Sequence, residues 1–189
     1  MPMLTYDDVL PRRPRRVLVA GTSGSGKTTL SAMISATLHV PHIEIDGLYH
    51  GPNWTPRESF RAEVESFAAR DGWVTEWQYS SVRGLLTERA DLLVWLDLPL
   101  RTVMRQVIVR TLSRRWRRVM LWNGNLEPPL RTILTDKEHI IRWAWDTRHN
   151  TAARIGALDS QYPALPVVRL RSHRQVRAWL AGPLSQTLR

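Results

Sequence analysis

Cysteine is absent from this 189-residue chain, and lysine is nearly absent: only two of the 27 basic residues, Lys27 and Lys137, are lysines. The lack of cysteine excludes disulfides, thiolate zinc sites, iron–sulfur clusters and cysteine nucleophiles. No apolar run approaches the roughly 18 residues that a membrane span needs. The first residues have no long apolar core of the kind found in signal peptides. We therefore expect a cytoplasmic protein without a membrane span.

Negative charge is scarce, because 17 acidic residues face 27 basic ones and the formal net charge is +10. A positive field of this size favours polyanionic partners such as nucleotides, nucleic acid or anionic lipid, without choosing among them. Arg12, Arg13, Arg15 and Arg16 form a basic cluster before the first apolar segment. This cluster is either a solvated lead-in to a strand or part of a nucleic-acid contact.

Short apolar segments alternate with amphipathic ones along the whole chain. Strands are predicted at 17–20, 42–45, 73–75, 92–96 and 167–170. Helices are predicted at about 27–38, from 56, at 80–89, 100–120 and 172–181, with two more within 130–158. This alternation predicts an α/β fold, with a parallel sheet covered by helices on both faces. We expect a single domain over 1–189, with an amino-terminal arm at 1–15 and a lid insertion at about 110–135.

Residues 21–28 read Gly-Thr-Ser-Gly-Ser-Gly-Lys-Thr and match the phosphate-binding pattern G-x-x-x-x-G-K-[ST] in full. The glycines let the backbone N–H groups wrap around phosphate oxygens, and the following helix adds the positive end of its dipole. Lys27 would reach the β- and γ-phosphates of ATP, and the Thr28 hydroxyl would ligate Mg²⁺. The expected nucleotide ligands here are Gly21, Ser23, Gly24, Ser25, Gly26, Lys27, Thr28 and Thr29.

The length of the chain excludes the larger ATP-driven machines, and neither lysine lies in the N-K-x-D sequence with which GTPases read their base. A small-molecule kinase is the remaining class, and it needs an acid at the end of a neighbouring strand. Glu76 and Asp97 both end predicted strands. Either would hold the water shell of magnesium beside Thr28, or would be an ordinary residue of a strand end.

The predicted helix after Asp97 is rich in arginine, and no acid lies between Asp97 and Glu127. Like charges along one helix repel unless an anion neutralises them, so we expect these arginines to close over the phosphates of ATP. An exposed basic helix and a nucleic-acid patch are the alternatives. The arginines are Arg101, Arg105, Arg110, Arg114, Arg115, Arg117 and Arg118.

Loops at the carboxyl ends of parallel strands form the ligand crevice of such folds. Asp46 follows the second predicted strand there, and it would accept a proton from an acceptor hydroxyl or bind a sugar; a plain turn carboxylate is the alternative. Tyr49, three residues further along the chain, is a further candidate to bind the acceptor. Arg57, Arg61 and Arg83 are candidates to clamp a phosphate of the acceptor.

Several segments resemble the bacterial group known as DNA topology modulation proteins, within the adenylate-kinase-like branch of P-loop kinases. They are residues 21–28, Asp46-Gly-Leu-Tyr49 with Gly51-Pro-Asn-Trp54, the segment 73–83, the segment 90–99, the arginine-rich helix, Leu121-Trp-Asn-Gly-Asn125, and Val168-Arg-Leu-Arg-Ser172. The resemblance implies a three-layer α/β core with a five-stranded parallel sheet, and ATP and Mg²⁺ as ligands.

The resemblance also implies roles for single residues. Related kinases have an aspartate where Glu76 stands, which favours Glu76 over Asp97 as the magnesium residue, although Trp77 replaces the usual glycine. Arg110 lies where such kinases contact the transferring phosphoryl group. Lid arginines would be among Arg114, Arg115, Arg117 and Arg118, and Arg171 with Ser172 would hold the adenine.

The sequence thus predicts an ATP-dependent kinase of a small molecule such as a nucleotide or nucleoside. In this prediction Lys27, Arg110, Asp46, Arg114 and Arg118 are the catalytic residues, and a small phosphoryl acceptor is the partner. The alternative is a nucleotide-gated nucleic-acid-binding protein that uses Arg12–Arg16 and Arg114–Arg118.

Overall fold

A computed structural model describes residues 1–117, 119–125, 140–147 and 149–187. The described strands form one sheet in the order β1-β6-β5-β2-β4-β3, and every pairing in it is parallel. The phosphate-loop strand β2 (Arg16–Gly21) lies in the middle, between β5 (Leu92–Leu96) and β4 (Trp73–Glu76). The α/β class and the parallel sheet predicted from the sequence are confirmed.

The sheet has one strand more than predicted. β1 (Met3–Leu4) comes from the amino-terminal arm and pairs with β6 (Val167–Leu170) at one edge. At the other edge, β3 contains only His42–Ile43, because a short helix, α2 (Ile45–Tyr49), begins where the sequence predicts the rest of the strand. The crevice side of the sheet is therefore built by a helix rather than by an extended segment.

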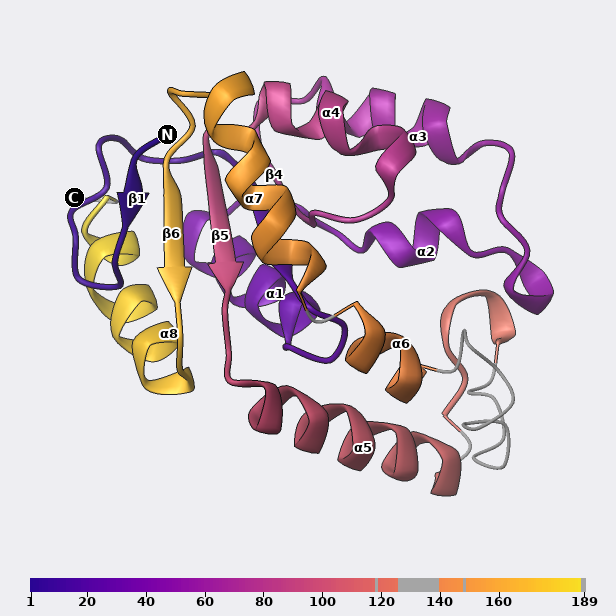
Figure 1. The fold of residues 1–189 in the computed structure, drawn as a ribbon. Coiled ribbons are helices and arrows are strands. Elements are labelled where there is room, and N and C mark those ends of the chain that lie inside the picture. The colour runs from indigo at the N-terminus through magenta and orange to yellow at the C-terminus, as the bar shows by residue number, and fades with distance from the viewer. Residues whose placement is uncertain (118, 126–139, 148, 188–189) are drawn as a thin grey trace.

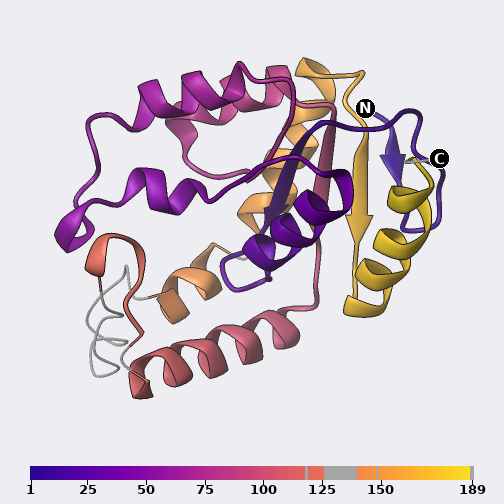
Figure 2. The same ribbon diagram turned by 180° about the vertical axis from the view of Figure 1, so that it is seen from behind.

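Helices cover both faces of the sheet (Figure 1). On one face α3 (Phe60–Ala68), α4 (Ser80–Arg89) and α7 (Asn150–Gln161) pack on Leu18, Leu93 and Trp95. On the other face α1 (Lys27–Leu38), α8 (His173–Trp179) and the short segment η4 (Leu180–Leu184) pack on Val19, Val94 and Val168, as the rear view shows (Figure 2). Within the described residues, no helix has the length and apolar character needed to cross a membrane.

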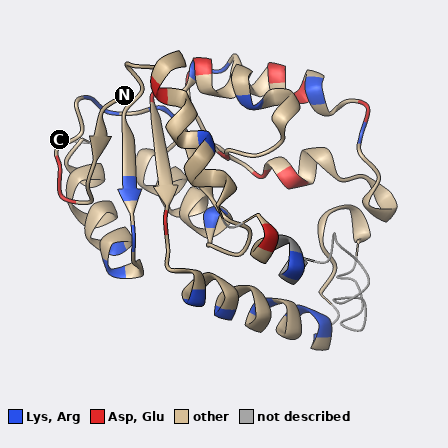
Figure 3. Ribbon diagram, viewed as in Figure 1, with Lys and Arg blue, Asp and Glu red and all other residues tan. Residues whose placement is uncertain are grey.

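The arginine-rich helix α5 (Leu100–Trp116) runs below the carboxyl ends of the strands (Figure 1). Val103, Val107 and Thr111 are its buried side chains. All of its charged residues are basic (Figure 3). The next described segments are the turn η2 (Trp122–Gly124) and the helix α6 (Ile140–Asp146). The part of the predicted lid at 126–135 lies outside the described residues, as does Arg118.

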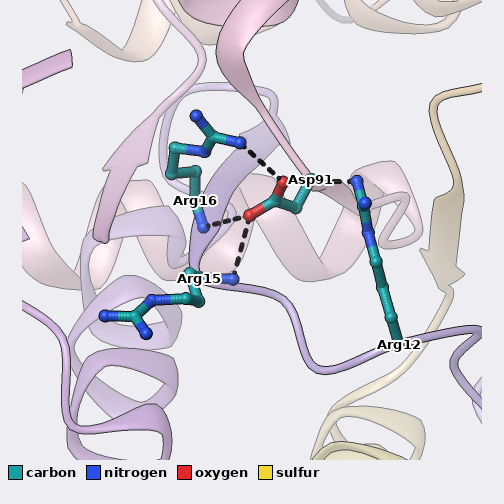
Figure 4. Close-up of polar contacts among 4 residues, drawn as sticks. All are labelled: Arg12, Arg15, Arg16 and Asp91. Carbon is teal, nitrogen blue, oxygen red and sulfur yellow. Dashed lines mark hydrogen bonds and ion pairs between the residues drawn. The ribbon is translucent and has the colours of Figure 1, made fainter. Parts of the chain in front are cut away.

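A carboxylate at the start of β5 anchors the basic cluster of the amino-terminal arm (Figure 4). Asp91 Oδ2 accepts the backbone N–H groups of Arg15 and Arg16 at 3.1 and 2.9 Å. Asp91 Oδ1 accepts the guanidinium groups of Arg16 at 3.1 Å and Arg12 at 3.3 Å. Three of the four arginines of this cluster therefore pin the start of β2 to the start of β5, a structural role that the sequence did not indicate.

Asp91 is expected to stabilise the fold in a pH-dependent way. Burial raises the pKa of Asp91, but the hydrogen bonds from the Arg16 side chain and from the Arg16 and Arg15 backbone lower it more, so the net pKa lies below its usual 3.8. Replacement by alanine leaves two partly buried N–H groups without this acceptor, and we expect Asp91→Ala to lower the free energy of unfolding by about 3 kcal/mol at pH 7.

Urea unfolding measures this loss. Because the folded-state pKa is depressed, the stabilisation is complete above pH 3.8 and disappears as the pH falls through the folded-state pKa. The gap between wild type and Asp91→Ala should therefore shrink in acid. Asp71→Ala, at an exposed aspartate, is the matched control and should leave stability within about 0.5 kcal/mol of wild type. Equal effects of the two substitutions would contradict the role given to Asp91.

Candidate active site

The loop between β2 and α1 has the backbone of a phosphate cradle. Gly24 and Gly26 have φ angles of +82° and +96°, in the left-handed region that glycine adopts at little cost. The Ser25 N–H donates to the Thr22 carbonyl oxygen at 3.1 Å, which closes the turn. A Cβ at Gly21 would lie 2.5 Å from Ser25 Oγ, so this position has no room for a side chain. The spacing of the three glycines is thus explained by the geometry of the loop.

Lys27 begins α1 and is buried, with only 9% of its surface exposed. Its Nζ donates to the Thr22 carbonyl oxygen at 3.2 Å. Burial lowers the pKa of Lys27, while the charges of Asp46 and Glu76 raise it and that of Arg110 lowers it. Three other residues predicted to belong to the site, each from a different element, are therefore near enough to act on the charge of Lys27.

The helix α5 lies directly against the phosphate loop. A Cβ on Gly24 would come within 2.8 Å of the Val107 Cβ. Arg110 and Arg114 follow Val107 at helical spacings of three and seven, so they lie on the face that meets the loop. Arg101, Arg105 and Arg115 are exposed. The structure thus brings Arg110 and Arg114 to the loop side and places the other three arginines toward solvent.

Glu76 ends β4 and is almost fully buried, at 2% exposure. Its Oε1 lies 3.2 Å from His42 Nε2, and its Oε2 accepts the Ile45 N–H at 3.2 Å. Burial raises the pKa of Glu76, but the hydrogen bond and charge of His42 and the Ile45 N–H lower it, and the net pKa lies below the usual value. Both oxygens are thus engaged, one with His42 of β3 and the other with the start of α2, the helix that carries Asp46.

Asp46 lies in the first turn of α2 and is half-buried. Its Oδ1 accepts the Tyr79 hydroxyl at 2.6 Å and the Gln78 amide at 3.1 Å. The Tyr49 ring stacks on the Tyr79 ring with centroids 4.0 Å apart, and its edge meets Phe60 at 5.0 Å. Tyr49 is therefore part of the wall behind Asp46, and its ring is packed against other rings.

The three arginines predicted to clamp the acceptor have different surroundings. Arg57 NH2 pairs with Glu63 at 2.6 Å, and Arg61 pairs with Glu65 on the exposed side of α3 at 2.9 Å. Arg83 lies over the Trp77 ring, with its guanidinium carbon 5.2 Å from the ring centroid, and its buried Nε has no hydrogen-bond partner. Burial lowers the pKa of Arg83, and the charge of Arg154 lowers it further.

On the other side of the loop, two predicted residues lie where β6 meets α8. The Ser172 Oγ caps α8 by accepting the Gln175 N–H at 3.2 Å, and Arg171 is exposed. Asp97, the alternative magnesium residue, accepts Arg169 Nε at 2.8 Å instead. The hydroxyl of Ser172 and the carboxylate of Asp97 thus both make contacts within the protein.

The segment after α5 is docked on the segment after α2. The Asn125 side chain, 5% exposed, accepts the Trp54 N–H at 3.1 Å and donates to the Gly51 carbonyl oxygen at 2.9 Å. Trp122 Nε1 donates to Glu44 Oε2 at 2.8 Å, and Asn123 donates to the His50 carbonyl oxygen. We call residues 121–125 the strap. It ties the arginine-rich helix to the chain beside Asp46.

The sequence analysis missed the roles of Tyr79, Gln78 and Asn125. Gln78 and Tyr79 lie two and three residues after Glu76, so their place beyond the carboxyl end of a strand was a usable signal. Asn125 gave no such signal in the sequence, because Trp54 and Gly51, to which it is hydrogen-bonded, lie more than 70 positions away. Among the described residues, no group of three or more acidic or histidine side chains is arranged to hold a metal ion.

Several of the solved structures to which this chain is similar are kinases by name. A gluconokinase from Sinorhizobium meliloti 1021 is 22% identical and aligns over 94% of this chain and 97% of its own, with a TM-score of 0.52. Shikimate kinases from Acinetobacter baumannii and Bacteroides thetaiotaomicron are 13% and 17% identical, cover 92% and 93% of this chain, and 93% and 98% of their own, and have TM-scores of 0.49 and 0.47.

The likeness to the gluconokinase structure shows that the two chains share a fold, and the structures with lower TM-scores add nothing to that conclusion. No protein-family model matches the chain, and the search of curated proteins finds no significant match. What the chain does must therefore be argued from its own residues.

The strap should depend on the amide of Asn125. Asn125→Asp keeps the oxygen that accepts the Trp54 N–H. It loses the N–H groups that donate to the Gly51 and Trp122 carbonyl oxygens, and the new carboxylate would repel these two oxygens. We expect faster hydrogen exchange at 119–125 and 51–56, and a stability loss of roughly 2 kcal/mol. The exposed Asn53→Asp is the matched control. Unchanged exchange in Asn125→Asp would show that the strap is held by other contacts.

Proposed function

We propose that this protein is an ATP-dependent kinase that transfers the γ-phosphoryl group of ATP to a hydroxyl group of a small molecule. The observation that carries the proposal is the meeting of a phosphate loop with a carboxylate that is held ready for an acceptor. Asp46 of α2 is close enough to Lys27 of the loop for its charge to raise the pKa of Lys27, against the larger effect of burial. One group binds the phosphoryl donor, and the other suits the deprotonation of the acceptor.

The residues of the loop fit the phosphates of ATP. The two left-handed glycines leave the cradle free of side chains, and Lys27 Nζ rests on a backbone carbonyl oxygen that a phosphate oxygen would replace. Magnesium, when bound, offsets negative charge on the transferring group. Thr28 is exposed at the start of α1 and would be its hydroxyl ligand, whereas the buried Glu76 would act through its charge and through water.

The reaction follows from the positions of these groups. Asp46 Oδ2 makes no hydrogen bond to any described residue, since its two donors both bind Oδ1. Oδ2 takes the proton of the acceptor hydroxyl as the acceptor oxygen forms its bond to the γ-phosphorus. The bond from the γ-phosphorus to the bridging oxygen breaks, and ADP leaves with the electron pair. Lys27, Arg110 and Arg114 stabilise the negative charge on the phosphoryl oxygens.

The acceptor is proposed to be anionic. Arg57 and Arg61 form ion pairs with Glu63 and Glu65. Arg83 is therefore the one of the three predicted acceptor arginines that has no carboxylate partner among the described residues. It lies one helical turn after Tyr79, whose hydroxyl holds Asp46. A phosphate or carboxylate on the acceptor would pair with Arg83, as in a nucleotide or a hydroxy acid.

The finer predictions stay part of this proposal. They are a single domain over 1–189 with a lid at about 110–135, adenine bound at Arg171 and Ser172, a place in the cytoplasm, and a relation to the DNA topology modulation group. One observation speaks against the alternative of a nucleotide-gated nucleic-acid-binding protein. Two of the arginines that it assigned to nucleic acid, Arg12 and Arg16, are bound to Asp91.

A panel assay tests the proposal. Purified protein with ATP and Mg²⁺ is incubated with gluconate, shikimate, nucleosides and nucleoside monophosphates, and phosphorylated product is followed by ³¹P NMR. We expect transfer to at least one compound with an anionic group. Lys27→Ala should reduce that transfer by at least about 100-fold with an unchanged circular dichroism spectrum.

Arg70→Ala removes one positive charge at an exposed site on the far end of α3 and should retain the rate of the wild type. Transfer at the wild-type rate by Lys27→Ala would refute the proposed role of the loop. Absence of any phosphorylated product with the whole panel, together with duplex DNA binding near physiological salt, would favour the nucleic-acid alternative instead.

A further inference from the structure

The two oxygens of Asp46 differ in their surroundings. Oδ1 accepts the Tyr79 hydroxyl at 2.6 Å and the Gln78 amide at 3.1 Å, whereas Oδ2 has no hydrogen bond from the described residues. Two donors on one oxygen fix the plane of a carboxylate, which a single donor does not. The orientation of Oδ2 is thus determined by residues that follow β4, not by α2 itself.

The Tyr79 hydroxyl is part of a longer chain of hydrogen bonds. It lies 3.2 Å from His50 Nε2, while His50 Nδ1 is buried without a partner. A buried N–H without an acceptor is rarer than a buried acceptor without a donor. We therefore assign the imidazole proton to Nε2. In that tautomer His50 donates to Tyr79 and Tyr79 donates to Asp46, so every proton of the chain points toward the carboxylate.

The backbone of Tyr79 is held in a costly conformation. Its φ and ψ angles are 55° and 109°, in the region that non-glycine residues seldom adopt. Its ring is fixed between the Tyr49 ring at 4.0 Å and the Phe60 ring at 5.2 Å. Burial raises the pKa of Tyr79, and the neighbouring charge of Asp46 raises it further. The hydroxyl is thus kept protonated and remains a donor throughout the ordinary pH range.

We propose that Tyr79, supported by His50 and Gln78, is the positioning residue of the catalytic carboxylate: it fixes Asp46 through Oδ1 and directs Oδ2 toward the acceptor. The inference rests on the proposed function, because it assigns to Tyr79 the task of preparing the base. It also explains why a strained tyrosine starts α4, since backbone strain persists where the surrounding structure enforces it and clusters at functional sites.

The charged and polar neighbours of the site stay in place in the test. Asp46, Glu76 of β4 and Arg110 of α5 all act on the charge of Lys27. His50 is joined to Asp46 through the Tyr79 hydroxyl. None of these groups is changed by Tyr79→Phe, which removes one hydroxyl and keeps the ring. This substitution therefore isolates the contribution of the donor.

The test compares Tyr79→Phe with Tyr6→Phe, which removes a hydroxyl from a half-buried ring on the other face of the sheet. Protein labelled with carbon-13 at the aspartate carboxyls is recorded by NMR, and the Asp46 signal is identified by its loss in Asp46→Asn. We expect the chemical shift of that signal to change in Tyr79→Phe, because a hydrogen bond to Oδ1 is lost, and to stay unchanged in Tyr6→Phe. Gln78→Leu should change it in the same direction.

The kinetic arm uses ATP, Mg²⁺ and whichever panel compound the wild type phosphorylates. Tyr79→Phe should lower kcat about tenfold with little change in the KM for ATP, and should move the acidic limb of the pH–rate profile upward. If Tyr79→Phe and Tyr6→Phe behave alike in both arms, the inference is overturned while the kinase function stands. If the NMR shift is found but no panel compound is phosphorylated, the proposed function fails and the hydrogen-bond geometry stands.

Discussion

A buried ammonium group governs the arrangement of this molecule. Lys27 is held at the start of α1 with little access to water, so its charge must be balanced from within. Asp46 and Glu76 supply that balance from α2 and from the end of β4, and Arg110 of α5 opposes it. Because the phosphate loop brings a cation into the protein, the neighbouring strands must bring carboxylates to the same edge of the sheet.

The carboxylates in turn are fixed by hydrogen bonds that cross between elements. Glu76 binds the Ile45 N–H and so sets where α2 begins, and Tyr79 binds Asp46 within α2. Asn125 of the strap binds Gly51 and Trp54 just beyond α2. Each of these contacts is at least half-buried, where an unpaired polar group is costly. The acceptor side of the crevice is thus a network in which one missing partner disturbs the next.

The elements made by local periodicity could be predicted from the sequence. The helices at 27–38 and 80–89 and the strands at 92–96 and 167–170 have the predicted bounds, because apolar spacing alone determines them. The phosphate loop could also be predicted from local sequence, because residues 21–28 match its motif in full. The strand predicted at 42–45 is wrong in its second half: Glu76 captures the Ile45 N–H, and the chain turns into α2 instead.

The candidate site was only partly readable. Its members Lys27, Asp46, Glu76 and Arg110 were predicted and lie together, whereas Arg61 pairs with Glu65, four residues away on the same helix. That pairing was visible in the sequence spacing. The network of Tyr79, His50 and Asn125 was not, because it joins residues between 29 and 74 positions apart through contacts that only the folded chain creates.

The central claim is that Lys27 and Asp46 act on the same phosphoryl transfer, and a double-mutant cycle on the transfer rate tests it most directly. The single variants Lys27→Met and Asp46→Asn and the double variant are compared with the wild type under saturating ATP and Mg²⁺. Residues that work as one unit give losses that do not multiply. The account predicts that the double variant is little slower than the slower single variant. Losses that multiply in full, or an Asp46→Asn variant as fast as the wild type, would contradict it.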